Sequence, residues 1–135
     1  MKIISNRPAI GYEQVAEVLF NCASLLQMAG GNPYRIAHYR QAALTFMTLG
    51  TPALEMALDE AQWPLLNLGK RLGAKIRELV RDGSMSFYVE LRADLPVAVD
   101  HLMDVYGVGP RLAIRLNKEL GVNSPAELAD AARRG

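Results

Sequence analysis

Residues 106–116 read YGVGPRLAIRL, with two glycines, a valine between them and a proline just before an apolar-periodic run. Glycine gives access to left-handed backbone conformations, and proline fits the first turn of a helix because no helical hydrogen bond is lost there. The stretch therefore predicts a tight turn followed by a helix. The turn is either a plain connector between helices or a place where unpaired N–H groups at the helix start meet an anion such as phosphate.

A second copy of this turn occurs earlier in the chain, with Gly69 placed forty residues before Gly109. Residues 65–83 read LLNLGKRLGAKIRELVRDG, and residues 105–122 read VYGVGPRLAIRLNKELGV. Each copy has an apolar residue before the glycine, a basic residue at the helix start and an apolar stripe. The predicted stripes are Leu72, Ile76, Leu79 and Val80, and Leu112, Ile114, Leu116 and Leu120. The repetition favours anion-binding turns over plain connectors, because two such sites can grip successive phosphates of one strand.

The apolar spacing predicts an all-α chain with short connections, organised as a small helical bundle followed by a second hairpin module. Val15, Leu19, Cys22 and Leu26, for example, follow the three-four spacing of one helix face. Asn-Pro, Thr-Pro and Ser-Pro pairs begin further helices. The expected helices cover residues 12–29, 34–50, 53–59, 70–81, 84–92, 96–105, 111–120 and 126–134, with residues 63–69 as a turn before the fourth. The expected caps are Ser84 for the fifth helix and a Ser124–Glu127 capping box for the last.

The composition is that of a globular protein of one domain or two small ones, since half of the 135 residues are hydrophobic and 21% are charged. No apolar run approaches a membrane span, and the first residues lack the apolar core of a signal peptide. The single cysteine, Cys22, excludes an internal disulfide and is expected to be a buried apolar residue. We therefore expect a cytoplasmic protein, nucleoid-associated in a prokaryote, with no membrane partner.

The charge distribution is more informative than the net charge of +1. Residues 70–81 contain one acid, Glu78, and several basic side chains. These are Lys70, Arg71, Lys75, Arg77 and Arg81. A local basic face matters more for phosphate binding than the sum over the chain, so nucleic acid remains a candidate partner.

The segment GGNPYRIAHYRQAA, residues 30–43, resembles the Gly-Asn-Pro-[Phe/Tyr]-Arg-x-x-x-Tyr-Arg-x-Ala-Ala segment of family X DNA polymerases, the DNA polymerase beta relatives. The two turn copies resemble the helix-hairpin-helix motifs of that family in order and spacing. The resemblance covers essentially the whole chain, and it implies a small helical domain at residues 1–92 and a second helix-hairpin-helix module at 93–135. The Asp-x-Asp pair that holds two magnesium ions in the family's nucleotidyltransferase domain does not occur, so we expect no polymerase activity from this chain.

The resemblance implies sequence-independent binding to gapped, nicked or single-stranded DNA, in DNA repair. Some family members also carry a lyase that removes a 5′-deoxyribose phosphate, and Lys75 aligns with its Schiff-base nucleophile. Arg35 and Arg71 align with phosphate-binding positions, and Tyr39 aligns with a tyrosine of the pocket. The predicted DNA-binding residues are Arg35, Tyr39, Arg40, Asn67, Gly69, Lys70, Arg71, Lys75, Gly107, Val108, Gly109 and Arg111.

The resemblance further implies a monovalent cation, Na⁺ or K⁺, at each hairpin, where it bridges backbone carbonyls to a DNA phosphate. No other cofactor is required. The predicted ligands are the carbonyls of Trp63, Leu65 and Leu68 in the first hairpin and of Met103, Val105 and Val108 in the second.

Three positions need separate comment. Ala74 stands where polymerase beta has an acidic residue before the lysine, so Glu78, one turn onward, is the candidate substitute for proton transfer. Asn67 replaces the first glycine of the first hairpin, and Asn is the non-glycine residue that best tolerates a left-handed conformation. His38, beside Tyr39, either assists a phosphate or a proton or is inert.

Three functions stay open on the sequence. The first is DNA binding through the paired hairpins, and the second adds the lyase at Lys75, which is otherwise a phosphate contact or a solvated surface residue. The third is a helical protein-interaction module. A separate catalytic or repair protein is the further partner that the sequence leaves open.

Overall fold

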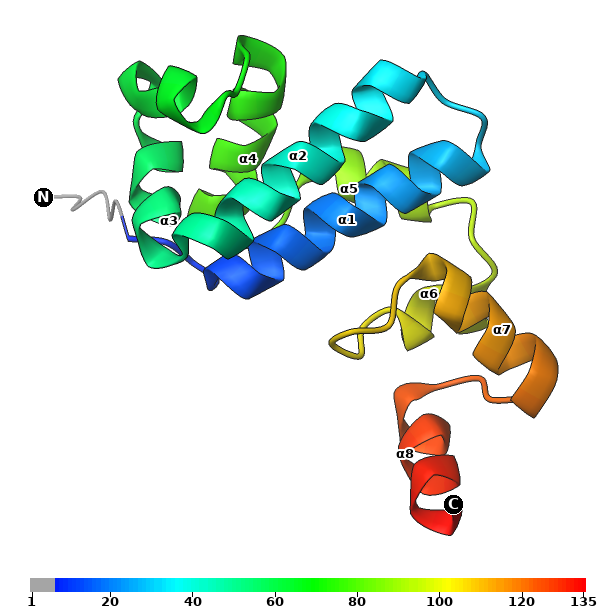
Figure 1. Cartoon of the computed structure of the whole chain (residues 1–135). Helices are drawn as coiled ribbons and strands as arrows, with labels where there is room; N and C mark the ends of the chain where they lie inside the picture. The colour runs from blue at the N-terminus through cyan, green and yellow to red at the C-terminus, as the bar shows by residue number, and fades with distance from the viewer. Residues whose placement is uncertain (1–6) are drawn as a thin grey trace, which may run out of the picture.

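The computed structural model describes residues 7–135, which form helices without a strand among them (Figure 1). Residues 1–6, part of the predicted 1–92 unit and of the stretch without a signal-peptide core, lie outside the described residues. The helices are α1 (Tyr12–Met28), α2 (Pro33–Leu49), α3 (Thr51–Leu58), the 3₁₀ helix η1 (Glu60–Leu66), α4 (Lys70–Asp82), α5 (Ser86–Arg92), α6 (Val97–Leu102), α7 (Pro110–Leu120) and α8 (Pro125–Arg134). The predicted all-α class is confirmed. Across the described range, no helix combines the length and the apolar character that a membrane crossing needs.

A first hydrophobic core is built by the helices α1, α2, α3, α4 and α5 together with η1. α1 and α2 run side by side, and α3 and α4 pack at one end of this pair (Figure 1). The three-four spacing of α1 places Val15, Leu19 and Cys22 in the core, where Phe46 of α2 is also completely buried. The predicted stripe of α4 is confirmed, since Leu72, Ile76, Leu79 and Val80 are all buried here. This core fixes α2 and α4 relative to one another.

Trp63 fixes the approach of η1 to α4. Its indole Nε1 donates a hydrogen bond of 2.8 Å to the carbonyl oxygen of Ala57. A Cβ atom on Gly73 would come within 2.4 Å of the indole ring, so only glycine lets α4 pass this closely. The prediction of a turn over residues 63–69 is wrong in part, because residues 60–66 form the 3₁₀ helix and the turn itself begins at Asn67.

A second, smaller core contains α6, α7 and α8. It gathers Leu102, Met103, Ala113 and Val122 with Leu25, which belongs to α1. Because Leu25 contributes to it, the second core is built directly on the first part of the chain. The predicted domain boundary between residues 92 and 93 falls at the end of α5 and stays a prediction.

The predicted stripe of α7 is wrong in part, since Ile114 and Leu116 pack against the second core but Leu112 and Leu120 do not. Residues 112, 114 and 116 are two apart and cannot share one face of an α-helix. Pro110 and Ala113 are the buried residues of α7, whereas Leu112 and Leu120 are 41% and 62% exposed. α6 is also shorter than predicted, since it ends at Leu102 and leaves Val105 in the loop.

Two predicted caps differ from the structure. Ser84 is not the N-cap of α5, because the buried Met85 holds that position. At α8, the Ser124 side chain accepts a hydrogen bond of 3.2 Å from the Glu127 N–H, as predicted. The Glu127 carboxylate, however, accepts from the N–H of Asn123 at 2.6 Å, so the reciprocal bond of the capping box is displaced by one residue.

Candidate nucleic-acid interface

The two predicted turns have matching backbone conformations. Asn67 is left-handed, with φ 58° and ψ 38°, and Gly107, at the equivalent position, has φ 86°. In each turn a buried apolar residue comes next, followed by a glycine N-cap with an extended backbone. These residues are Leu68 and Gly69 before α4, and Val108 and Gly109 before α7. The repeat seen in the sequence is therefore a repeat of the backbone, and Asn67 does adopt the conformation expected of it.

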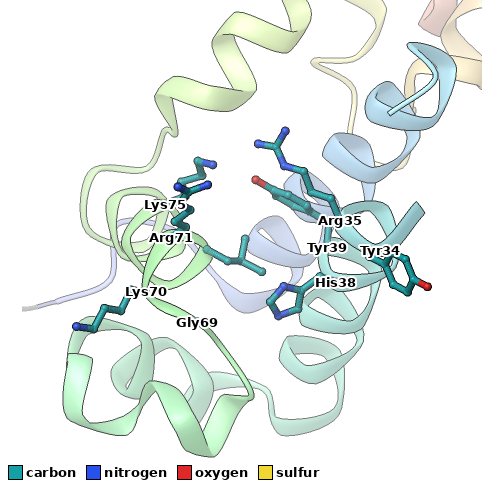
Figure 2. A pocket seen from close by; sticks show the side chains of 9 residues that line it. Tyr34, Arg35, His38, Tyr39, Gly69, Lys70, Arg71 and Lys75 are labelled. Carbon is teal, nitrogen blue, oxygen red and sulfur yellow. The ribbon is translucent and has the colours of Figure 1, made fainter. Parts of the chain in front are cut away.

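A cavity of about 680 Å³ opens beside the first turn, between α2 and the start of α4 (Figure 2). Arg35 and Tyr39 reach into it from α2, and Arg71 and Lys75 face them from α4. None of the described residues that line it is acidic. The lining contains six of the predicted DNA-binding residues, which are Arg35, Tyr39, Gly69, Lys70, Arg71 and Lys75. The cavity is therefore electropositive and open to the N-terminus of α4, as an anion site requires.

Phe87 of α5 organises two of these cations. The Nζ atom of Lys75 and the guanidinium carbon of Arg35 each lie 4.5 Å from the centre of the Phe87 ring. Tyr39 stacks against the same ring, with 5.9 Å between the ring centroids. Cation–π contacts of this kind hold flexible cationic side chains in defined positions. Phe87 was not predicted for the site, because it lies on a different helix and no local pattern links it to the site.

The Tyr39 hydroxyl is a buried polar group without a hydrogen-bond partner among the described residues. Its side chain is 2% exposed, and burial raises the pKa of the hydroxyl to about 12. The neighbouring Arg35 charge opposes this rise, although its guanidinium does not reach hydrogen-bonding geometry. A ligand oxygen in the cavity would give this hydroxyl the acceptor that it lacks.

Lys75 is half-buried, and its surroundings disfavour its charge. Partial burial lowers the pKa of the Lys75 ammonium, and the positive charges of Arg35 and Arg71 lower it further. The carboxylate of Glu90 has a smaller, opposing effect on the same pKa. Lys75 consequently presents more neutral amine than an ordinary lysine at the same pH.

Glu78, the predicted substitute for the acidic residue at position 74, is engaged elsewhere. Its carboxylate accepts hydrogen bonds from the N–H and the hydroxyl of Ser86, at 3.2 and 2.6 Å, and so fixes the start of α5. His38 lines the cavity, and its Nε2 lies 3.2 Å from the carbonyl oxygen of Asn67. His38 therefore ties α2 to the first turn.

The second turn does not line this cavity but lies against α1. The N–H of Gly107 donates a hydrogen bond of 3.0 Å to Oε1 of Glu17, and the Tyr106 hydroxyl donates one of 3.2 Å to Oε2 of Glu13. Burial raises the pKa of the Glu17 carboxyl, and the bond from Gly107 opposes that rise. Neither glutamate was predicted to reach the turn, since both lie about ninety residues from their partners.

Two predicted DNA-binding arginines, Arg40 and Arg111, do not line the cavity and meet outside it. The Oε1 atom of Gln27 accepts hydrogen bonds from Arg40 at 2.7 Å and from Arg111 at 2.9 Å. All three side chains are exposed. Two arginines from α2 and α7 thus form a second positively charged spot beside the end of α1.

Backbone carbonyls of both turns are partly engaged within the chain. The Trp63 oxygen accepts the Leu68 N–H, and the Val105 oxygen accepts the Val108 N–H, each at 3.0 Å. The Trp63 oxygen also accepts the N–H of Asn67. A carbonyl oxygen has two lone pairs, so the Val105 oxygen retains one for a further partner. The carbonyl oxygens suit Na⁺ or K⁺ chemically, and the cation remains a prediction.

Comparison with known proteins gives one informative similarity. No protein-family model matches the chain. The chain is 25% identical over 122 residues to the DNA polymerase/3′-5′ exonuclease PolX of Bacillus subtilis (strain 168), an alignment that covers 90% of the chain and 21% of that enzyme. The chain thus spans about a fifth of the length of this relative. The chain is thus similar to a part of this PolX enzyme over most of its own length, which agrees at this level with the predicted resemblance to family X polymerases.

Proposed function

We propose that this chain binds the sugar-phosphate backbone of DNA without reading its sequence, and that the cavity between α2 and α4 is its principal phosphate site. The observation that carries the proposal is the convergence of Arg35, Arg71 and Lys75 on one cavity whose described lining has no acid. Phosphate contacts of this kind supply affinity and position but no sequence information.

Two further features of the cavity support a DNA strand with an unpaired base as its ligand. The unpartnered Tyr39 hydroxyl offers a hydrogen-bond donor to a ligand oxygen. Tyr34, at the rim of the cavity, is 86% exposed and offers its ring to an unpaired base. Stacking on an aromatic ring is tolerant of sequence. These features favour a gapped, nicked or single-stranded DNA over an intact duplex.

Monovalent cations at the two turns belong to the same proposal. The carbonyls of residues 63, 65 and 68, and of residues 103, 105 and 108, would hold Na⁺ or K⁺ beside a phosphate oxygen. The ion would supply positive charge at a turn whose own groups are neutral. Replacing KCl by tetramethylammonium chloride at equal ionic strength should weaken DNA binding if these ions contribute.

The proposal is tested by fluorescence anisotropy with a gapped duplex that carries a 5′-phosphate, between about 50 and 200 mM salt. We expect log K to fall linearly with log[salt], with a slope of about −2 to −3 for two or three neutralised phosphates. A scrambled DNA of equal length should bind equally well. Affinity that does not respond to salt would contradict the proposal, and a chain that binds no DNA but forms a defined oligomer would favour the protein-interaction alternative.

A deoxyribose-phosphate lyase is the second candidate, and the lowered pKa of Lys75 is the observation that favours it. The neutral amine would attack the C1′ aldehyde of an abasic 5′-sugar phosphate, and water would leave to give a Schiff base. Transfer of a C2′ proton to solvent water would then let its electron pair form a C2′–C3′ double bond and break the C3′–O bond, which frees the DNA 5′-phosphate. Water would finally hydrolyse the sugar from the lysine.

Borohydride trapping on an abasic 5′-phosphate substrate separates the two candidates. Lys75→Arg keeps a positive charge for DNA binding but cannot form the Schiff base, whereas Lys118→Arg on α7 is the matched control. We expect the lyase, if present, to trap in wild type and Lys118→Arg alone. Equal trapping by Lys75→Arg would show that Lys75 is not the nucleophile, while DNA binding without trapping in wild type would leave the first candidate standing alone.

A further inference from the structure

The second turn already holds an anion that belongs to the chain itself. The N–H of Gly107, at the position where a phosphate would approach, donates to the Glu17 carboxylate at 3.0 Å. Glu17 is half-buried and lies on α1, one helical turn after Glu13, which accepts the Tyr106 hydroxyl. A carboxylate on a backbone N–H is chemically close to a phosphate oxygen on the same group.

The α1 surface also fits the turn closely. A Cβ atom on Gly109 would come within 3.0 Å of the Oδ1 atom of Asn21. Glu13, Glu17, Asn21, Tyr106, Gly107 and Gly109 line one common pocket of about 280 Å³. The glycines of the second turn therefore pack against α1. In this arrangement α1 occupies the space that a DNA strand would need.

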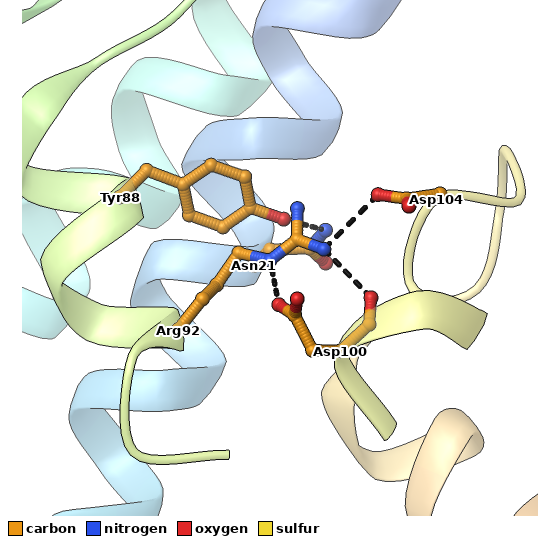
Figure 3. A network of polar contacts seen from close by, with 5 residues as sticks. All are labelled: Asn21, Tyr88, Arg92, Asp100 and Asp104. Atoms are coloured by element: carbon orange, nitrogen blue, oxygen red, sulfur yellow. Dashed lines mark hydrogen bonds and ion pairs between the residues drawn. The ribbon is translucent and has the colours of Figure 1, made fainter. Parts of the chain in front are cut away.

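A partly buried polar network holds this arrangement in place (Figure 3). Arg92 of α5 donates to the Asp100 carboxylate at 2.6 Å, to the Asp100 carbonyl at 2.7 Å and to Asp104 at 3.1 Å. Tyr88, under the Arg92 guanidinium, accepts a hydrogen bond of 3.0 Å from Asn21. The network joins α1, α5, α6 and the loop before the second turn, so displacement of the turn requires a coordinated movement of these parts.

We infer that Glu17 is an internal substitute for a DNA phosphate, which masks the second turn until DNA displaces it. In the masked form DNA reaches the cavity at the first turn but not the N–H groups of the second. Occupation of the second turn then requires the Gly107–Glu17 bond to break. This inference rests on the proposed function, because it assumes that the chain binds DNA phosphates.

The test compares Glu17→Gln with Glu55→Gln by anisotropy on the same gapped DNA across the same salt series. Both substitutions remove one negative charge, but Glu55 is exposed on α3, so it controls for the change in net charge. We expect Glu17→Gln to bind about fivefold more tightly than Glu55→Gln, the size that an exposed charge contact usually has.

Tyr106→Phe gives an independent measurement, since it removes the hydroxyl that bonds Glu13 and leaves Glu17 untouched. We expect a smaller gain in DNA affinity from it. In ¹⁵N NMR spectra, the Gly107 amide signal should shift in Glu17→Gln, and it should shift again on addition of DNA.

The outcomes separate the inference from the proposed function. If wild type binds DNA with the expected salt dependence but Glu17→Gln binds no more tightly than Glu55→Gln, the mask is overturned and the proposed function stands. A Gly107 signal that ignores DNA in every variant overturns the mask as well. If neither wild type nor any variant binds DNA, the proposed function fails, and the inference fails with it.

Discussion

Arg35 and Lys75 come from different helices and lie against one aromatic ring, each 4.5 Å from the centre of Phe87. Their closeness places the charge of the exposed Arg35 beside the half-buried Lys75. After burial itself, the Arg35 charge is the strongest cause of the lowered pKa of Lys75. This pair accounts for both proposed activities, since the two cations attract phosphate and the neutral form of the lysine is a nucleophile.

Replacement of Arg35 by Gln should raise the pKa of Lys75. Removal of a neighbouring positive charge favours the charged ammonium, so less neutral amine remains at any given pH. An NMR titration of the Lys75 side chain measures the pKa directly. Arg77→Gln, which alters a cation packed on Trp63, is the control and should leave the Lys75 titration unchanged. A lower or unaltered pKa in Arg35→Gln would contradict this account of the site.

Replacement of Gly73 by Ala should destabilise the fold by about 1–3 kcal/mol, although alanine is the better helix former. The added methyl group would come within 2.4 Å of the Trp63 ring. Gly69→Ala is the matched control, because no atom lies within 4 Å of its Cβ position. Urea unfolding gives both free energies, and equal stability of Gly73→Ala and wild type would show that α4 does not depend on this close approach.

Substitutions of Asn67 test the first turn. Asn67→Gly should leave the stability nearly unchanged, whereas Asn67→Ala should cost about 1 kcal/mol because alanine resists the left-handed conformation. Thermal unfolding of the two variants measures the difference. If alanine were tolerated as well as glycine, the left-handed conformation would not be required for this turn.

Cys22 should be inert in the folded chain. Burial raises the pKa of its thiol to about 12, so the reactive thiolate is scarce at neutral pH and the sulfur is shielded. We expect 5,5′-dithiobis(2-nitrobenzoic acid) to react only as urea unfolds the chain. Rapid reaction at neutral pH without urea would contradict the burial of Cys22.

Local signals in the sequence were sufficient for much of the fold. Glycine and proline pairs marked the ends of α1, α2 and α7, and the type of residue at position 67 indicated its left-handed conformation. The 3₁₀ helix over Glu60–Leu66 escaped prediction because it is short, contains Pro64 and has no apolar period.

Contacts between distant segments were not predictable in the same way. Phe87 and Glu17 each reach the candidate sites from another helix, and nothing beside them in the sequence marks this role. The apolar residues of α7 do not all share one helix face, and Leu112 and Leu120 of the predicted stripe are exposed. The positions of Arg35, Tyr39 and Lys75 around one cavity agree with the arrangement that the family resemblance implied, and their role in binding stays a prediction.

The most direct test of the central claim compares two charge-matched double variants. Their affinities for gapped DNA that carries a 5′-phosphate are measured across a salt series. Arg35→Gln with Arg71→Gln alters the cavity, whereas Arg133→Gln with Arg134→Gln alters α8, which lies far from α2 and α4 (Figure 1). We predict that the cavity variant binds at least about tenfold more weakly, with a salt slope shallower by about 2, and that the α8 variant stays close to wild type. Equal losses in the two variants, or no loss in the cavity variant, would contradict the assignment of the cavity as the phosphate site.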